Sequence, residues 1–241
     1  MSTKVAACQV PDIRMNPDES LGWIEKFAKK AETEGASLVC FPECFLQGYL
    51  TDEASAKQYA INLSSPQFEE ILRRLQHLRP MIVFGMIEEE NFLLFNTAVI
   101  IRQGKLIGKY WKNHLLDGER IFQAGSACPA FEIDGLRFGI NICYDTQFPE
   151  TARKLAEQQV QLILCPSNNM MRYATAEKFK ELHHKVRVER VNENKVWLVS
   201  SDVTGEREGR ISYGPTSSIN PAGQVVKQVP LMEFGMIVVE I

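Results

Sequence analysis

The sequence predicts an α/β protein in which two mixed β-sheets pack face to face and helices cover their outer faces, a four-layer αββα sandwich. Short apolar strand patterns alternate with amphipathic helix patterns early in the chain, and strand pairs linked by tight turns dominate elsewhere. Apolar strands of this kind need cover on both faces. With 241 residues, 45% of them hydrophobic, we expect one domain over 1–241.

The first elements follow from local signals. After an apolar strand at 5–10, Asn16 can cap a helix that has Pro17 in its first turn and Glu19 at the capping-box position, and Gly35 closes that helix. A short strand at 37–41 follows and stops at Pro42. The next predicted elements are a helix at 67–76 and strands at 81–87, 93–102 and 105–111, and the last two strands are joined by a tight hairpin at Gln103-Gly104.

The second part of the chain continues this pattern. Asp134-Gly135 is typical of a hairpin turn, and Pro149 opens a helix where its missing N–H costs nothing. The predicted strands are 130–133, 136–143, 162–165, 196–201, 217–220, 225–228 and 235–240, and the predicted helices are 149–159 and 175–194.

Cys143 ends a buried-strand pattern just ahead of a helix start, which is the setting of a nucleophile. The positive end of a helix dipole favours the thiolate form of such a cysteine. Two complementary groups also follow strand patterns, Glu43 after 37–41 and Lys112 after 105–111. Because catalytic groups of α/β proteins gather at the carboxyl ends of strands, we expect these three side chains to meet.

Four segments around these residues carry a resemblance to a known family. They are FPECFLQGY at 41–49, KYWKNHL at 109–115, DGERIFQAG at 117–125 and NICYDTQFPETAR at 141–153. Together they resemble the nitrilase superfamily of carbon–nitrogen hydrolases, and the order Glu43, Lys112, Cys143 matches the catalytic triad of that family. The resemblance spans nearly the whole chain and also implies the four-layer sandwich.

The resemblance implies a role for each of these residues. Cys143 would attack an amide carbon and form a thioester, Glu43 would transfer protons, and Lys112 would stabilise the oxyanion. The N–H of Tyr144 would be a second oxyanion donor. Glu119 would hold the lysine and touch the substrate. The positions expected to line the pocket are Tyr49, Asn113 and Asn168.

Other polar residues favour structural interpretations. Asp145 is expected to orient the turn that follows the nucleophile. Adjacent histidines on a helix point in different directions, so His183 and His184 are predicted to be surface residues rather than metal ligands. Packing or a dimer interface is expected for Arg187, Arg190, Glu193 and Asn194. We expect no metal and no cofactor, because no nucleotide-binding motif is found.

Composition excludes several classes of protein. A formal net charge of -3 without a basic block argues against a nucleic-acid partner, and no apolar stretch approaches the ~20 residues that a membrane span needs. Six cysteines without a CxxC pair, and an N-terminus that leads directly into a strand, predict a cytoplasmic protein without disulfides.

The expected reaction is hydrolysis of a small linear amide with release of ammonia, as in ω-amidases. Tyr144-Asp145 follows the cysteine, as in the amidase and carbamoylase branches, rather than the Trp-Glu of nitrilases. Thr146-Gln147 stands where some carbamoylases carry arginines, and ω-amidase-like members have arginine in place of Gln147. Arg172 or Arg207 could instead bind a substrate carboxylate. An N-carbamoyl-amine hydrolase and a non-catalytic amide-binding protein remain alternatives, and a homodimer or higher homo-oligomer is expected.

Overall fold

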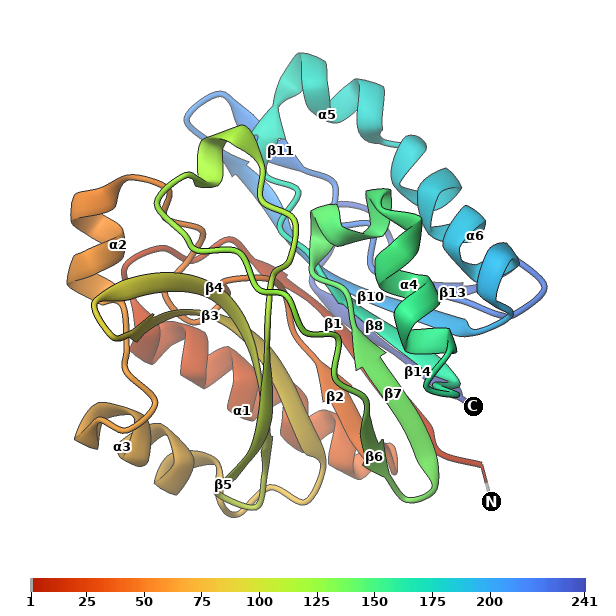
Figure 1. Cartoon of the computed structure of the whole chain (residues 1–241), viewed down its shortest axis with the longest axis horizontal. Coiled ribbons are helices and arrows are strands. Elements are labelled where there is room, and N and C mark those ends of the chain that lie inside the picture. The colour runs from red at the N-terminus through yellow and green to blue at the C-terminus, as the bar shows by residue number, and fades with distance from the viewer. Residues whose placement is uncertain (1) are drawn as a thin grey trace.

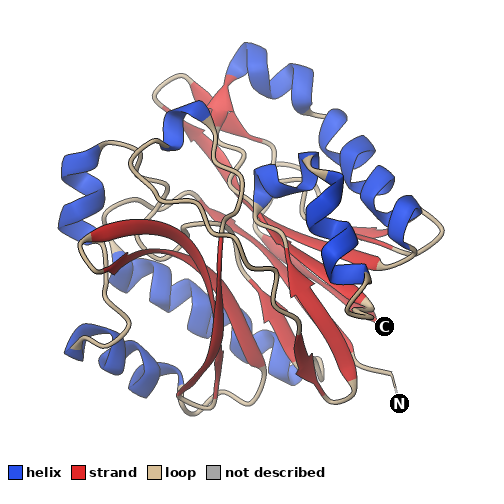
Figure 2. Ribbon diagram, viewed as in Figure 1, coloured by secondary structure: helices blue, strands red, loops and turns tan. Residues whose placement is uncertain are grey.

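The computed structural model describes residues 2–241, and its helices lie outside a large curled sheet (Figures 1 and 2). The helices are α1 (Pro17–Thr33), α2 (Glu53–Tyr59), α3 (Pro66–Leu75), α4 (Pro149–Ala156), α5 (Tyr173–Phe179) and α6 (Leu182–Asn194), with short 3₁₀ turns η1 (Asp117–Glu119) and η2 (Cys143–Gln147). Within residues 2–241, the structure contains no helix with the length and apolar character that a membrane crossing requires.

The sheet consists of two mixed halves. In the first sheet half the strands lie in the order β5 (Lys105–Trp111), β4 (Leu93–Arg102), β3 (Met81–Glu90), β2 (Leu38–Cys40), β1 (Lys4–Pro11) and β14 (Gly235–Glu240). In the second sheet half the order is β6 (Phe131–Ile133), β7 (Leu136–Ile140), β8 (Leu162–Pro166), β10 (Trp197–Arg207), β12 (Ser217–Ile219) and β13 (Val225–Gln228).

The two sheet halves are one continuous ladder, because β1 pairs in parallel with β10 over Gln9–Pro11. Their inner faces pack together: Ala7 and Val83 of the first half share a core cluster with Ile140 and Leu164 of the second. Outside the first half lie α1 and α3, and outside the second lie α4 and α6 (Figure 1). The predicted α/β class is therefore confirmed, and the two sheets that the sequence predicts are joined at this point into one curled sheet.

Several predicted boundaries are wrong. The helix predicted over 175–194 is broken between Phe179 and Leu182 into α5 and α6. The strand predicted over 136–143 ends at Ile140, because the backbone leaves the ladder before Cys143. The short elements α2, β9 (Met171–Arg172) and β11 (Arg210–Ser212) were not predicted, since each is too short to show a periodic pattern.

Parallel strands bring the predicted site residues to one end of the sheet. β2 and β3 are parallel, and the β3–β4–β5 meander returns β5 to the same direction. The carboxyl ends of β2, β5, β7 and β8 thus face the same region, where Glu43, Lys112, Cys143 and Asn168 follow them.

Candidate active site

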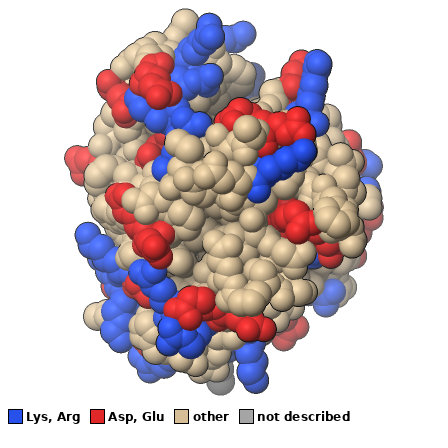
Figure 3. Space-filling model, turned by 90° about the vertical axis from the view of Figure 1, so that its left-hand side faces the viewer, with Lys and Arg blue, Asp and Glu red and all other residues tan. Residues whose placement is uncertain are grey.

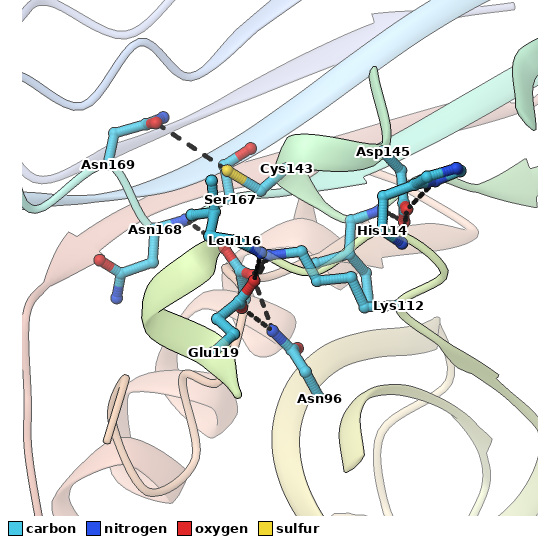
Figure 4. Close-up of polar contacts among 12 residues, drawn as sticks. Asn96, Lys112, His114, Leu116, Glu119, Cys143, Asp145, Ser167, Asn168 and Asn169 are labelled. Atoms are coloured by element: carbon cyan, nitrogen blue, oxygen red, sulfur yellow. Dashed lines mark hydrogen bonds and ion pairs between the residues drawn. The ribbon is translucent and has the colours of Figure 1, made fainter. Parts of the chain in front are cut away.

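Lys112 lies between two buried carboxylates (Figure 4). Its Nζ is 2.6 Å from Oε1 of Glu43 and 2.8 Å from Oε1 of Glu119. The exposed fraction is 1% for Lys112, 1% for Glu43 and 0% for Glu119, so the three groups interact with little screening by solvent. The structure therefore brings together three of the four residues that were predicted to be catalytic.

Asn96 of β4 completes this carboxylate–lysine cluster and was not predicted. Its Nδ2 donates to Oε1 of Glu43 at 2.8 Å and to Oε1 of Glu119 at 3.1 Å. Its backbone carbonyl accepts from the N–H of Lys112 at 2.9 Å. A single asparagine within the apolar strand Leu93–Arg102 was the only sequence signal for it.

The turn that carries Glu43 depends on a close approach of two backbones. A Cβ on Gly85 of β3 would lie 2.2 Å from the backbone nitrogen of Cys44 and 2.6 Å from Cα of Glu43. Only glycine therefore fits at position 85. Hydrogen bonds from Gly85 N–H to the Pro42 carbonyl and from Leu46 N–H to the Gly85 carbonyl fix the turn against the sheet.

Cys143 stands at a sharp bend, with a φ of 42° in the left-handed region that ordinary residues seldom adopt. Asp145 holds the bend in place, as expected for it. Its carboxylate accepts from the N–H groups of Ile142 at 3.0 Å and His114 at 2.8 Å, and from the Tyr110 hydroxyl at 2.7 Å. These bonds compensate for the strain of about 1 kcal/mol that such a φ costs.

The electrostatic surroundings of Cys143 do not favour the thiolate form that the sequence predicts for it. Burial raises the pKa of the Cys143 thiol well above its ordinary value, and the Glu43 carboxylate raises it further, while Lys112 lowers it only in part. The thiol is therefore protonated at neutral pH, and the short η2 turn does not reverse that. Burial also raises the pKa of Glu43. Burial alone would lower the pKa of Lys112, but Glu43 and Glu119 raise it well above its usual range.

The remaining predicted pocket residues are placed in different ways. Tyr49 is half-buried, and its burial raises the pKa of its phenol, as do the nearby carboxylates of Glu43 and Glu119. Tyr144 is half-buried, with its ring edge-on to Phe148 at 5.2 Å. The structure does not bring Asn113 into the cluster, because its Nδ2 lies 3.2 Å from Sγ of Cys128.

Asn168 contacts the cluster through its backbone rather than its side chain. Its N–H donates to Oε2 of Glu43 at 3.0 Å, whereas its Nδ2 lies 3.4 Å from the Asp12 carboxylate. The next residue, Asn169, was missed: its Oδ1 lies 4.0 Å from Sγ of Cys143 (Figure 4). Asp202 of β10, also missed, accepts hydrogen bonds from the backbone and the side chain of Asn169.

The histidines and Arg187 of α6 pack against the second sheet half. His183 and His184 are half-buried instead of lying on the surface, because α6 packs against the sheet, and burial lowers the pKa of His183 to about 3. Arg187 is buried and donates to the Pro215 carbonyl at 2.8 Å. Residues 2–241 hold no group of three or more His, Cys, Asp or Glu side chains arranged for a metal ion.

The two arginines considered for a substrate carboxylate differ. Arg207 is paired with Asp12 and lies 3.4 Å from Glu208, while Arg172 is exposed at the end of β9.

On the face of the molecule seen in Figure 3, lysine and arginine side chains are interspersed with aspartate and glutamate, and no extended patch of one charge appears there.

The buried Glu–Lys–Glu cluster and the cysteine on the sharp strand-end bend lie at the same end of a curled α/β sheet. The chain matches the carbon–nitrogen hydrolase family over residues 4–241. It is 32% identical to a nitrilase from Pyrococcus abyssi over 99% of this chain and 89% of that protein. It is 29% identical to an omega-amidase from Homo sapiens over 83% of this chain and 75% of that protein.

Solved structures show the same fold. An amidase from Nesterenkonia sp. matches with a TM-score of 0.86 and 24% identity, covering 99% of this chain and 90% of that one. The chain therefore belongs to the carbon–nitrogen hydrolase family of the nitrilase superfamily, which confirms the resemblance seen in its motifs. It is a hydrolase that acts on carbon–nitrogen bonds other than peptide bonds.

Proposed function

We propose that this protein hydrolyses a small linear amide through a Cys143 thioester and releases ammonia. One observation carries the proposal: Lys112 is held between Glu43 and Glu119 by bonds of 2.6 and 2.8 Å, and Cys143 is close enough for both Glu43 and Lys112 to affect its pKa. A site that only bound amides would gain nothing from an unusual buried ion cluster beside a strained cysteine.

In the acylation step the Glu43 carboxylate takes the thiol proton while Sγ of Cys143 bonds to the amide carbon. The raised pKa of Glu43 suits this role, because it brings the proton affinity of the base closer to that of the thiol. The carbonyl oxygen becomes an oxyanion, which the Lys112 ammonium stabilises together with the N–H of Tyr144. Glu43 then gives its proton to the nitrogen, the C–N bond breaks, and ammonia leaves.

In the deacylation step Glu43 acts as a base a second time. It removes a proton from water, and the resulting hydroxide attacks the thioester carbon. The C–S bond breaks, the acid is released, and the sulfur regains the proton from Glu43. Throughout the cycle Glu119 keeps Lys112 charged and in place, through its own bond from the Leu116 N–H at 2.7 Å.

Support for an amide substrate comes from the relatives. Human omega-amidase is among them, and a cysteine-to-alanine variant of the Nesterenkonia amidase is described in complex with butyramide, a simple linear amide. Arg172 remains a candidate to bind a distal carboxylate, because it is exposed, whereas Arg207 is already paired with Asp12. The same proposal includes a cytoplasmic location and a homodimer that associates through its outer helices. Sedimentation as a monomer at micromolar concentration would contradict the dimer.

The test is ammonia release from simple amides, ω-amides of dicarboxylates, N-carbamoyl amines and nitriles, with Cys143→Ala as the control. We expect release from an amide class and none from the variant, with the variant folded as judged by circular dichroism. Release only from N-carbamoyl amines would replace the amide assignment by the carbamoyl alternative. Release that persists in Cys143→Ala would exclude the thioester route, and a lack of turnover with every compound would favour the binding protein.

A further inference from the structure

Asp202 is a buried carboxylate beside the nucleophile that the proposed reaction does not use. It lies on β10 where that strand pairs with Gln9 of β1, at the junction of the two sheet halves, and it has an exposed fraction of 0%. A buried carboxylate needs hydrogen-bond donors to offset the loss of water. Among residues 2–241, the two donors to its side chain both belong to Asn169.

The two bonds fix both the backbone and the side chain of Asn169. Oδ1 of Asp202 accepts from the Asn169 N–H at 3.0 Å, and Oδ2 accepts from Nδ2 of the same residue. An ionised carboxylate can only accept, so the amide must turn its NH₂ towards Asp202 and its carbonyl oxygen away. That oxygen lies 4.0 Å from Sγ of Cys143.

We propose that Asp202 is a positioning residue for the nucleophile, acting through Asn169 to keep an acceptor rather than a donor facing the Cys143 thiol. The Asn169 carbonyl oxygen can accept a hydrogen bond from the protonated thiol. The same oxygen disfavours the thiolate, so the thiol stays protonated until Glu43 removes its proton. The inference uses the proposed function only in naming Cys143 as the nucleophile.

The charged and titratable groups around Asp202 and Cys143 come from several elements. Burial raises the pKa of Asp202 to about 7, while Arg187 and the bonds from Asn169 lower it. Above pH 7.5 the carboxyl is therefore mostly ionised and the acceptor orientation holds. The groups that face the pair are Glu43 after β2, Lys112 after β5, Cys165 on β8 and Arg187 on α6.

The substitution Asp202→Asn should invert the polarity of the group at the thiol. The new Oδ1 can still accept from the Asn169 N–H, but a new NH₂ then replaces Oδ2. To avoid two NH₂ groups facing each other, Asn169 must turn its carbonyl towards position 202 and its own NH₂ towards Cys143. A donor stabilises the thiolate, so the pKa of Cys143 should fall.

The experiment is the rate of Cys143 alkylation by iodoacetamide from pH 7.5 to 10, followed by mass spectrometry of the Cys143 peptide. We expect the rate at pH 8 to rise about fivefold or more in Asp202→Asn, because the fraction of thiolate increases. Ser201→Ala is the matched control, since Ser201 is equally buried on β10 but bonds to the Cys40 carbonyl and the Cys8 N–H. It should alkylate at the wild-type rate.

Asn169→Ala provides a second route if Asp202→Asn does not fold. It removes the acceptor at the thiol, so its Cys143 should also alkylate faster than in the wild type. In the double variant the Asp202 change should add nothing, since Asp202 acts through Asn169. Unchanged alkylation in either folded variant, or equal changes in Ser201→Ala, would overturn the proposal. Because the measurement follows the thiol and not turnover, this failure is distinct from failure of the proposed reaction.

Discussion

Glu43 and Lys112 come from the first sheet half and Cys143 comes from the second, and the two sides of the site are built differently. On the first side, charged groups hold one another: Lys112 contacts two carboxylates, and Asn96 bridges both. On the second side, Asp145 holds a strained backbone by accepting from N–H and hydroxyl donors. Glu43 and Lys112 are therefore held in place by charge, and Cys143 is held in place by backbone geometry.

This difference has an energetic consequence. Removing one member of a buried charged cluster leaves the others unpaired in a medium of low dielectric constant, which costs stability as well as activity. Removing the thiol leaves the bend and its hydrogen bonds in place. Stability measurements on matched variants can therefore distinguish the two modes of construction.

The largest effect is expected for Lys112→Met, which leaves Glu43 and Glu119 close together without their cation. We expect a loss of about 3–5 kcal/mol in the free energy of unfolding, together with loss of turnover. Cys143→Ala is the comparison variant and should lose turnover while changing stability by less than about 1 kcal/mol. Urea denaturation measures both. Equal losses of stability in the two variants would contradict the distinction between the two sides.

The next effect concerns the junction between the halves and depends on pH. The folded pKa of Asp202, about 7, lies above its ordinary value of 3.8, so the proton favours the folded state. This contribution is complete below pH 4 and is lost as pH rises through 7. Asp202→Asn lacks it, so the stability of the wild type relative to the variant should fall by about 2–3 kcal/mol between pH 5 and pH 8. A pH-independent difference in urea titrations would show that Asp202 does not titrate in this range.

Asp145→Asn tests directly whether the Asp145 carboxylate holds the backbone bend at Cys143. One carboxylate oxygen becomes an NH₂ group that faces existing donors, so a buried donor loses its acceptor at a cost of about 2 kcal/mol. We expect turnover to fall at least tenfold, because the Cys143 bend is no longer held. Thermal unfolding and ammonia release measure the two effects. Turnover equal to wild type would mean that the bend is stable without this carboxylate.

The smallest effect is expected for Thr146→Val. The Thr146 hydroxyl donates to the Cys143 carbonyl at 2.7 Å and is the second brace of the bend. Its loss should cost about 1 kcal/mol and reduce turnover a few-fold. Ammonia release at saturating substrate measures this effect; a loss of turnover as large as that of Asp145→Asn would show that Asp145 is not the main brace.

The local signals of the sequence were sufficient for most elements and for the charged cluster. Asn16 caps α1 by accepting from the Glu19 N–H, and β5 ends at Trp111 as predicted, which places Lys112 directly after it. Left-handed φ angles at Gln103 and Asp134 confirm the two tight hairpins. These features depend on a few neighbouring residues, so a short stretch of sequence specifies them.

Residues placed by pairing between distant strands were not predictable in this way. Asn96 lies in the middle of β4, and Asp202 lies in the middle of β10, where a polar residue is usually exposed on one face of a sheet. Their burial follows from β5 pairing with β4 and from β1 pairing with β10, which no local pattern reveals. Burial between the sheet halves also raises the pKa of Cys143, and this outweighs the lowering of its pKa that the sequence predicts from the helix end.

The position of β1 also constrains the order in which the chain can fold. This strand pairs with β2 and β10, and its residues Lys4–Gln9 pair with β14 at Gly235–Glu240, near the other end of the chain. Such contacts give a high contact order, because a loop of nearly the whole chain must close before they form. A nascent chain therefore cannot complete its central strand until β14 has left the ribosome. We expect folding to be slow, with apolar β1 exposed to chaperones until β14 is available to pair with it.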